Sequence, residues 1–143
     1  MSVQIVQIRV YHSRDEAALA ELWQSCNLTR PWNNPQLDIS RKLEGQSDWL
    51  LVGVKDDRIV ASVMVGYDGH RGWINYLAVA PDQQRTGIGQ AMMAEAEQRL
   101  RTIGCPKINL QVRADNTEAV AFYRSIGFQQ DNVLSFGKRL VDD

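Results

Sequence analysis

The sequence has few cysteines, almost no excess of charge of either sign, and no long apolar run. Its two cysteines, Cys26 and Cys105, form no C-x-x-C pair, so neither a zinc site nor a dithiol redox motif is indicated. With 16 basic and 17 acidic residues the net charge is −1, which argues against a nucleic-acid binder with a broad basic face. No apolar run approaches the ~20 residues of a membrane span. The sequence therefore predicts no metal, no nucleic-acid partner and no membrane partner.

The N-terminal stretch lacks the pattern of a secretory signal. Residues 1–10 contain no basic region followed by an apolar block. They are therefore not expected to form a secretory signal. Two unpaired cysteines suit a reducing compartment, so we expect a cytoplasmic protein. Hydrophobic residues make up 44% of the 143 residues, which is enough for one domain with its own core. No repeat, linker or low-complexity segment divides residues 1–143, so the sequence predicts a single domain.

Hydrophobic periodicity predicts an α/β fold in the order β-α-α-β-β-β-α-β-α-β-β. The expected strands are residues 5–11, 49–55, 58–66, 73–79, 107–112, 128–132 and 133–140. The expected helices are residues 13–26, 35–44, 87–103 and 116–126. This order favours a mixed central sheet of about six to seven strands, with helices on both faces.

A glycine-containing turn joins one expected strand to the longest expected helix. Residues 77–89 read LAVAPDQQRTGIG, with Gly87 and Gly89 at the turn. Glycine lets backbone N–H groups approach a ligand closely, and the helix N-terminus adds unpaired N–H groups and a positive dipole end. The segment therefore indicates a phosphate or pyrophosphate site. The alternative is a simple tight turn, and neither a P-loop nor a dinucleotide fingerprint is present.

A second motif follows at a fixed distance. The chain combines the first motif, Gln84-x-x-Gly87-x-Gly89, with N-x-x-A-x-x-F-Y-x-x-x-G-F from Asn116 to Phe128. This pair, with the order of elements around it, resembles the GCN5-related N-acetyltransferase (GNAT) family over essentially the whole chain. More narrowly, the segments 30–33, 66–72 and 104–107 are similar to YpeA-type bacterial acetyltransferases.

The resemblance implies acetyl-CoA as the co-substrate. It implies a bulged strand 73–79 that splays from strand 107–112, with the pantetheine arm in the gap between them. Asn116 would hydrogen-bond the CoA arm, and Tyr123 would lie near the sulfur. Backbone groups of the bulged strand and of the turn would hold the arm and the pyrophosphate of CoA. These are Leu77, Ala78 and Val79 for the arm, and Gln84, Arg85, Thr86, Gly87, Ile88 and Gly89 for the pyrophosphate.

The implied reaction transfers an acetyl group from acetyl-CoA to a primary amine by direct attack in a ternary complex. A lysine-like amine has a pKa of about 10.4, so it must lose a proton before it attacks. A backbone N–H of the bulged strand would stabilise the negative thioester oxygen. Tyr123 is the expected general acid for the departing thiolate. The alternative for Tyr123 is a core position, because it lies on the apolar stripe of its helix.

The general base is left open by the sequence. Many relatives carry a glutamate at the position of Asn75. The Asn75 amide cannot usefully accept a proton, although it could order a water. His70 has an unperturbed pKa of about 6.5 that suits a base, but it also reads as an exposed hairpin tip. Asp68 and Glu44 are weaker candidates. A nucleophilic role for Cys105 is the alternative to a turn residue, although no histidine lies near it in the sequence.

The acceptor site is expected at the first two helices, their junction and the hairpin 67–72. Arg30 and Trp32 are candidates for substrate contact, or they belong to a proline-pinned loop. Asp68 and Tyr76 are further candidates, and Tyr76 would otherwise pack beneath the sheet. The acceptor could be a protein amine, a polyamine or a small metabolite.

Two other functions compete with this interpretation. A non-catalytic acyl-CoA sensor or interaction module is suggested by the missing glutamate at Asn75. A toxin-like enzyme acting on charged tRNA is disfavoured by the near-neutral charge. Pairing of residues 128–140 across a two-fold axis would make a homodimer.

Overall fold

The computed structural model describes residues 6–29 and 34–141, and these residues form one sheet with four α-helices. The sheet has five strands in the order β1-β2-β3-β4-β5. The strands are β1 (Gln7–Val10), β2 (Leu50–Lys55), β3 (Arg58–Tyr67), β4 (Gly72–Val79) and β5 (Ile108–Leu110). The helices are α1 (Glu16–Ser25), α2 (Pro35–Glu44), α3 (Ile88–Thr102) and α4 (Thr117–Ser125).

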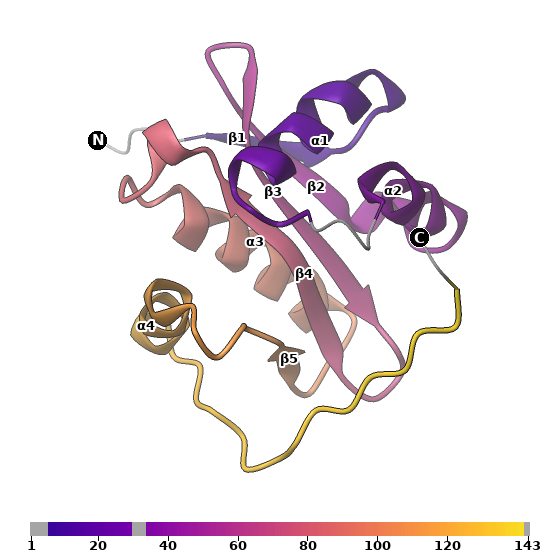
Figure 1. Ribbon diagram of the computed structural model, residues 1–143, viewed down its shortest axis with the longest axis vertical. Coiled ribbons are helices and arrows are strands. Elements are labelled where there is room, and N and C mark those ends of the chain that lie inside the picture. Colours follow the sequence, from indigo (N-terminus) through magenta and orange to yellow (C-terminus); the bar gives the residue numbers. More distant parts are fainter. Residues whose placement is uncertain (1–5, 30–33, 142–143) are drawn as a thin grey trace.

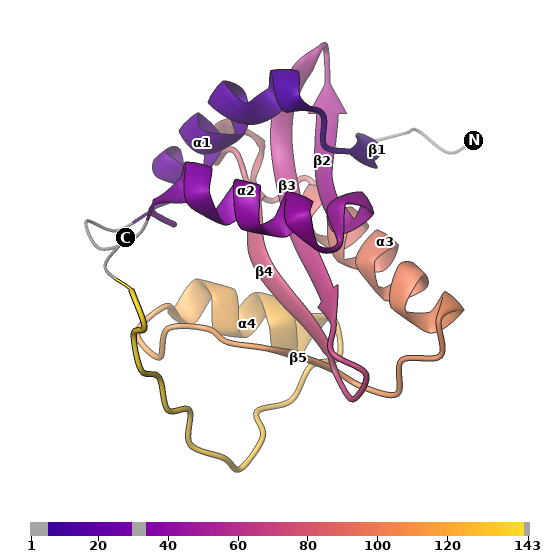
Figure 2. The ribbon, with the colours of Figure 1, turned by 90° about the vertical axis from the view of Figure 1, so that its right-hand side faces the viewer.

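The sheet lies between two layers of helices. Strands β1 to β4 are antiparallel to one another, and β5 is parallel to β4. Helices α1 and α2 cover one face, whereas α3 and α4 lie on the other side (Figure 1). Helices α1 and α2 face the viewer in Figure 2, where β4 and β5 separate toward one end. The α/β class with a mixed sheet is therefore confirmed.

Local sequence signals account for several boundaries. The Asn34 side chain accepts a hydrogen bond from the N–H of Leu37 at 3.2 Å, and Pro35 occupies the first helical position of α2. Asp56 and Asp57 both have positive φ, at 52° and 60°. Two consecutive left-handed residues match the twist of a tight hairpin, so they join β2 directly to β3.

The core lies on both faces of the central strands. Strands β2 and β3 are almost continuously apolar, because helices cover both of their faces. The largest fully buried side chains are Trp23, Leu19, Ile39, Leu50, Leu51, Ile88, Met92, Leu100, Val52, Val60, Val63 and Val65. Gly53 is required here, since a Cβ at this position would lie 2.8 Å from Val6. This packing fixes β3 and β4 between α1 and α3.

The two closing strands predicted over residues 128–140 do not form in the described part of the chain. Val133, Leu134, Phe136 and Leu140 are 76%, 83%, 90% and 88% exposed. A strand is favoured when one face is buried, and residues 132–141 are exposed throughout. Side chains tie the segment to β5 instead, with Asn109 Nδ2 of β5 2.9 Å and the preceding Lys107 Nζ 3.0 Å from the Asp131 carboxylate. The sheet therefore has five strands rather than six to seven, and β5 is shorter than the predicted span 107–112.

Candidate active site

Strand β4 contains a bulge at Tyr76. Ser62 pairs with Ala78 and Met64 with Asn75, so two steps along β3 oppose three steps along β4. Tyr76 itself has φ of 52°, in the left-handed region. For a residue with a side chain this conformation costs about 1–2 kcal/mol, so the surroundings must hold it in place.

A buried chain of hydrogen bonds holds the bulge. The Trp23 indole N–H donates to Ser62 Oγ at 2.9 Å, and Ser62 Oγ donates to the Tyr76 carbonyl at 2.7 Å. Trp23 and Ser62 are both fully buried. The Tyr76 ring stacks on Trp23 with ring centroids 3.8 Å apart, and its hydroxyl donates to the Asp38 carboxylate. The sequence alternative in which Tyr76 packs beneath the sheet is partly realised, because one side of its ring covers Trp23.

Beyond the bulge, β4 separates from β5. Their pairing runs from Gly72 with Ile108 to Ile74 with Leu110, and no later pair forms in the described chain. The edge of residues 77–79 that faces away from β3 therefore has no strand partner there. A bulge and an open strand edge are the features expected where backbone N–H and C=O groups bind an extended ligand.

The turn after β4 leads into the N-terminus of α3. Gly87 caps this 15-residue helix with φ of 90°, which glycine adopts easily, and Arg85 also has a positive φ of 63°. No side chain caps the helix, so its first N–H groups point outward from the turn. The Gln84 side chain donates to the Val79 carbonyl at 3.1 Å. This bond fixes the turn to the open end of β4.

Gly89 has a packing role that the motif alone does not reveal. A Cβ at this position would lie 3.3 Å from the ring of Phe122 in α4. The absence of a side chain therefore brings the first turn of α3 close to α4. The two motifs recognised in the sequence meet at this contact.

Asn116 and Tyr123 lie at the start and near the end of α4. Asn116 Oδ1 accepts the N–H of Ala119 at 3.1 Å and caps the helix, which leaves its Nδ2 group to donate elsewhere. Tyr123 packs edge-on against Phe122 and Phe128, with centroid distances of 5.2 Å and 5.7 Å. Burial raises the pKa of Tyr123 to about 12, so the phenol is protonated at neutral pH. Tyr123 is thus both packed against aromatic neighbours and able to donate a hydrogen bond from its protonated hydroxyl.

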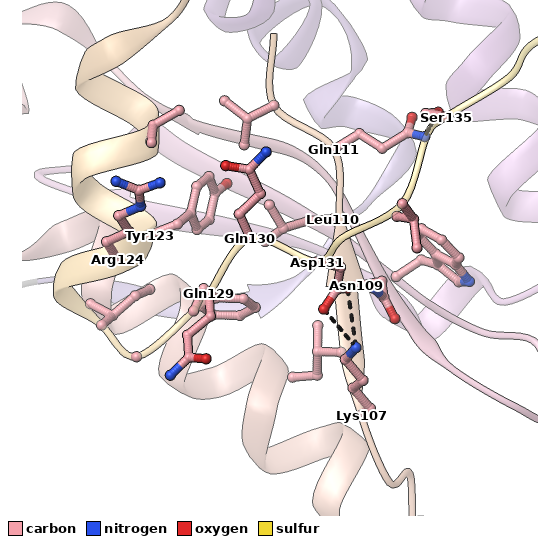
Figure 3. A pocket seen from close by; sticks show the side chains of 18 of the residues that line it. Lys107, Asn109, Leu110, Gln111, Tyr123, Arg124, Gln129, Gln130, Asp131 and Ser135 are labelled. Atoms are coloured by element: carbon pink, nitrogen blue, oxygen red, sulfur yellow. Dashed lines mark hydrogen bonds and ion pairs between the residues drawn. The ribbon is translucent and has the colours of Figure 1, made fainter. Parts of the chain in front are cut away.

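Two cavities flank these elements, and neither is lined by the turn 84–89. The larger, about 1430 Å³, lies between β5, α4 and residues 128–135. Figure 3 shows Tyr123 projecting from α4 into it, toward Leu110 of β5. The smaller, about 440 Å³, lies on the α2 side and is lined by Asn75 and Tyr76. Tyr123 and Asn75 therefore belong to different cavities, on opposite sides of β4.

The hairpin candidates lie at a distance from the bulge. The Asp68 carboxylate accepts the N–H groups of His70 and Arg71 at 2.8 Å and 2.6 Å and the indole N–H of Trp73 at 3.0 Å. These bonds lower its pKa to about 2, the Arg71 bond most strongly. At about 3.3 Å per strand residue, Gly72 and Tyr76 are ~13 Å apart. The structure thus places Asp68 and His70 at the hairpin tip, away from the bulge.

The remaining candidates are distributed more widely. Arg30 and Trp32 lie outside the described residues. Glu44 ends α2 and is exposed, whereas Cys105 is half-buried and its thiol donates to the Lys107 carbonyl at 3.3 Å. Asp38 was not identified from the sequence, although the i, i+3, i+4 spacing of three charged residues on α2 was a readable signal.

In residues 6–29 and 34–141, no cluster of three metal-ligating side chains occurs. No helix in these ranges is long and apolar enough to cross a membrane.

Comparison with known proteins decides the family. A profile of the acetyltransferase (GNAT) family matches residues 16–128. The chain belongs to the GNAT acetyltransferase family. It is 45% identical over 139 residues to an acetyltransferase of Sodalis glossinidius, covering 96% of this chain and 98% of that one. An acetyltransferase of Pectobacterium atrosepticum is 43% identical over 138 residues, with the same coverage.

A solved structure with the same fold supports the architecture of this GNAT protein. The PaiA N-acetyltransferase of Thermoplasma acidophilum, solved in complex with coenzyme A, gives a TM-score of 0.77 at 18% identity. The match covers 93% of each chain. The protein is therefore an enzyme, an acetyl-CoA-dependent acetyltransferase that acts on an amine acceptor.

Proposed function

We propose that this GNAT protein acetylates a primary amine by direct attack on acetyl-CoA in a ternary complex. The observation that carries the proposal is the bulge at Tyr76, which lies where β4 separates from β5 and before the uncapped N-terminus of α3. The turn residues 84–89 would bind the pyrophosphate through backbone N–H groups. The open edge of residues 77–79 would pair with the pantetheine arm, and Asn116 Nδ2 would donate to it.

The chemistry then follows from charge development. The amine nitrogen attacks the thioester carbon, and the oxygen becomes negative as the tetrahedral intermediate forms. A backbone N–H of the bulged strand stabilises this oxygen, and such preorganised donors act strongly away from water. The C–S bond then breaks, the nitrogen loses a proton, and the sulfur gains one.

Tyr123 is proposed to donate to the departing sulfur. Its pKa of about 12 exceeds the ~8.5 of an ordinary thiol. The phenol therefore stabilises the thiolate mainly by hydrogen bonding. The thiolate then takes a proton from water, and the amine releases its own proton to water. Asn75 is proposed to order a water that accepts this proton, because an amide is too weak a base to do so itself. His70 is kept as the competing base, and a His70→Ala variant with unchanged turnover eliminates it.

Calorimetric titration tests the donor site. Acetyl-CoA and S-acetylpantetheine, which lacks the pyrophosphate, are titrated into the wild-type protein and Gly87→Glu. We expect acetyl-CoA to bind the wild type much more tightly than the truncated donor, and the variant to lose this difference. Thermal unfolding of the variant shows that it is folded. Equal binding of both donors by the wild type would contradict the assignment of the turn.

A further inference from the structure

The smaller cavity lies beside the bulge on the α2 side of the sheet. It is lined by Asp38, Arg41, Lys42, Met64, Asn75 and Tyr76. We propose that it binds a small zwitterionic acceptor, in which a carboxylate lies within a few bonds of the amine that is acetylated. This proposal rests on the proposed function and names the substrate class of the same site. Its basis is the pairing of one carboxylate with two cations around a cavity of about 440 Å³.

The charges of this cavity come from one face of α2. Asp38, Arg41 and Lys42 follow the i, i+3, i+4 spacing, so they project on the same side of the helix. The lining therefore contains one acidic and two basic side chains. A polyamine would bring several positive charges against Arg41 and Lys42. A zwitterion offers one ammonium to Asp38 and one carboxylate to the two cations.

Asp38 is held at the bulge side of the cavity. Its carboxylate accepts the hydroxyl hydrogen of Tyr76, and it lies 3.5 Å from Arg41. A carboxylate has about four acceptor sites, so these partners leave capacity for an ammonium group. Because the Tyr76 side chain links Asp38 to the bulged strand, an amine bound to Asp38 would lie beside the bulge.

Lys42 supplies a half-buried cation one helical turn from Asp38. Its ammonium donates to the Val65 carbonyl and to Gln46 Oε1, the latter at 3.3 Å. Burial lowers its pKa, because the ammonium has lost part of its hydration. A ligand carboxylate would compensate for this loss. Lys42 therefore favours an anionic group more than an exposed lysine would.

The cavity volume favours a small molecule over a protein chain. Sites for small ligands typically have volumes of about 300–1,000 Å³, and this one lies near the lower end of that range. An amino acid fits such a volume, with its amine and its carboxylate both within reach of the lining side chains. A peptide N-terminus has no carboxylate beside its amine unless an acidic side chain follows.

A matched amine panel tests the proposal. Free amino acids, the corresponding amino-acid amides and spermidine are offered with acetyl-CoA, and acetylated products are quantified by mass spectrometry. We expect at least one amino acid to exceed its amide in kcat/KM by about 10- to 100-fold, the range of one charge-assisted hydrogen bond. Spermidine should react no better than the amides.

Charge reversal provides the decisive variant. Arg41→Glu replaces one of the two basic side chains of the lining by a second carboxylate and should invert the preference, so that amides or spermidine exceed the amino acids. Arg101→Glu on α3 is the matched control, because Arg101 also lies at helical spacing from a carboxylate, 3.4 Å from Glu97. This control should keep the wild-type order. Retained preference in Arg41→Glu would overturn the proposal.

Binding separates this proposal from the proposed function. Chemical shifts of the Asn75 and Tyr76 amides are followed during titration of each amine into the CoA complex, whether or not turnover occurs. Amino acids should shift these signals at lower concentration than their amides. Equal shifts, or acetylation of amides as fast as of amino acids, would refute the zwitterion while leaving the acetyltransferase proposal intact. Failure to bind acetyl-CoA would refute both.

Discussion

Replacing Ser62 by alanine should destabilise the protein and reduce its activity through one buried contact. Ser62 Oγ accepts from the Trp23 indole and donates to the Tyr76 carbonyl, at 2.9 Å and 2.7 Å. Ser62→Ala leaves both groups buried without this partner. Each unpaired buried group costs about 1–3 kcal/mol, so the free energy of unfolding should fall by about 2–6 kcal/mol. That is a large part of the 5–15 kcal/mol typical of a domain.

The assay is urea unfolding together with steady-state kinetics. Ser125→Ala is the control, because its hydroxyl donates to the Phe122 carbonyl at the exposed end of α4, and its loss should stay within about 0.5 kcal/mol. Trp23→Phe removes the indole donor, so the double variant with Ser62→Ala should be less destabilised than the sum of the single variants, by about 1 kcal/mol. A loss below about 0.5 kcal/mol for Ser62→Ala, or an unchanged kcat/KM, would refute the idea that this contact supports the bulge.

Three further predictions concern the turn, the acid and the hairpin. Gly87→Ala should lower the free energy of unfolding by about 1–2 kcal/mol, because a residue with a side chain is strained at φ of 90°. The variant should also bind acetyl-CoA more weakly in calorimetry. Unchanged binding would argue against the turn as the pyrophosphate site. Tyr123→Phe should keep acetyl-CoA binding and stability but lose turnover, whereas full turnover would remove the donor role. Asp68 should titrate near pH 2 by NMR, below the ~3.9 of an unfolded chain. Its contribution to stability is therefore complete above about pH 4 and is lost as the pH falls through 2; a measured pKa near 3.9 would contradict the hairpin hydrogen bonds.

Local signals predicted most of the fold. The cap at Asn34 with Pro35, the paired aspartates at 56–57 and the glycine turn at 87 each specify backbone geometry within a few residues, and the structure follows them. Residues 128–140 were mispredicted, because alternation indicates a strand only when another strand and a buried face are available. A three-residue β5 offers little backbone to pair with.

The candidate site was less accessible from sequence. The family resemblance implied the bulge, but nothing local marks Tyr76 as a left-handed residue. The partners that hold it, Trp23 and Ser62, are 39 positions apart in the chain. The link of Asp38 to Tyr76 likewise spans 38 positions, so the charge spacing on α2 could mark Asp38 as a candidate but could not show this contact. Long-range contacts of this kind depend on how strands and helices pack, which hydrophobic periodicity does not specify.

The most direct test of the account is an NMR titration of acetyl-CoA that follows the backbone amides. The account predicts that the largest shifts occur at residues 77–79 and 85–89, where the arm and the pyrophosphate would bind. The chemical shifts of amides that line the larger cavity, between β5, α4 and residues 128–135, should change less, with Tyr123 as the exception. Large shifts confined to that cavity, with residues 85–89 unchanged, would contradict the proposed donor site.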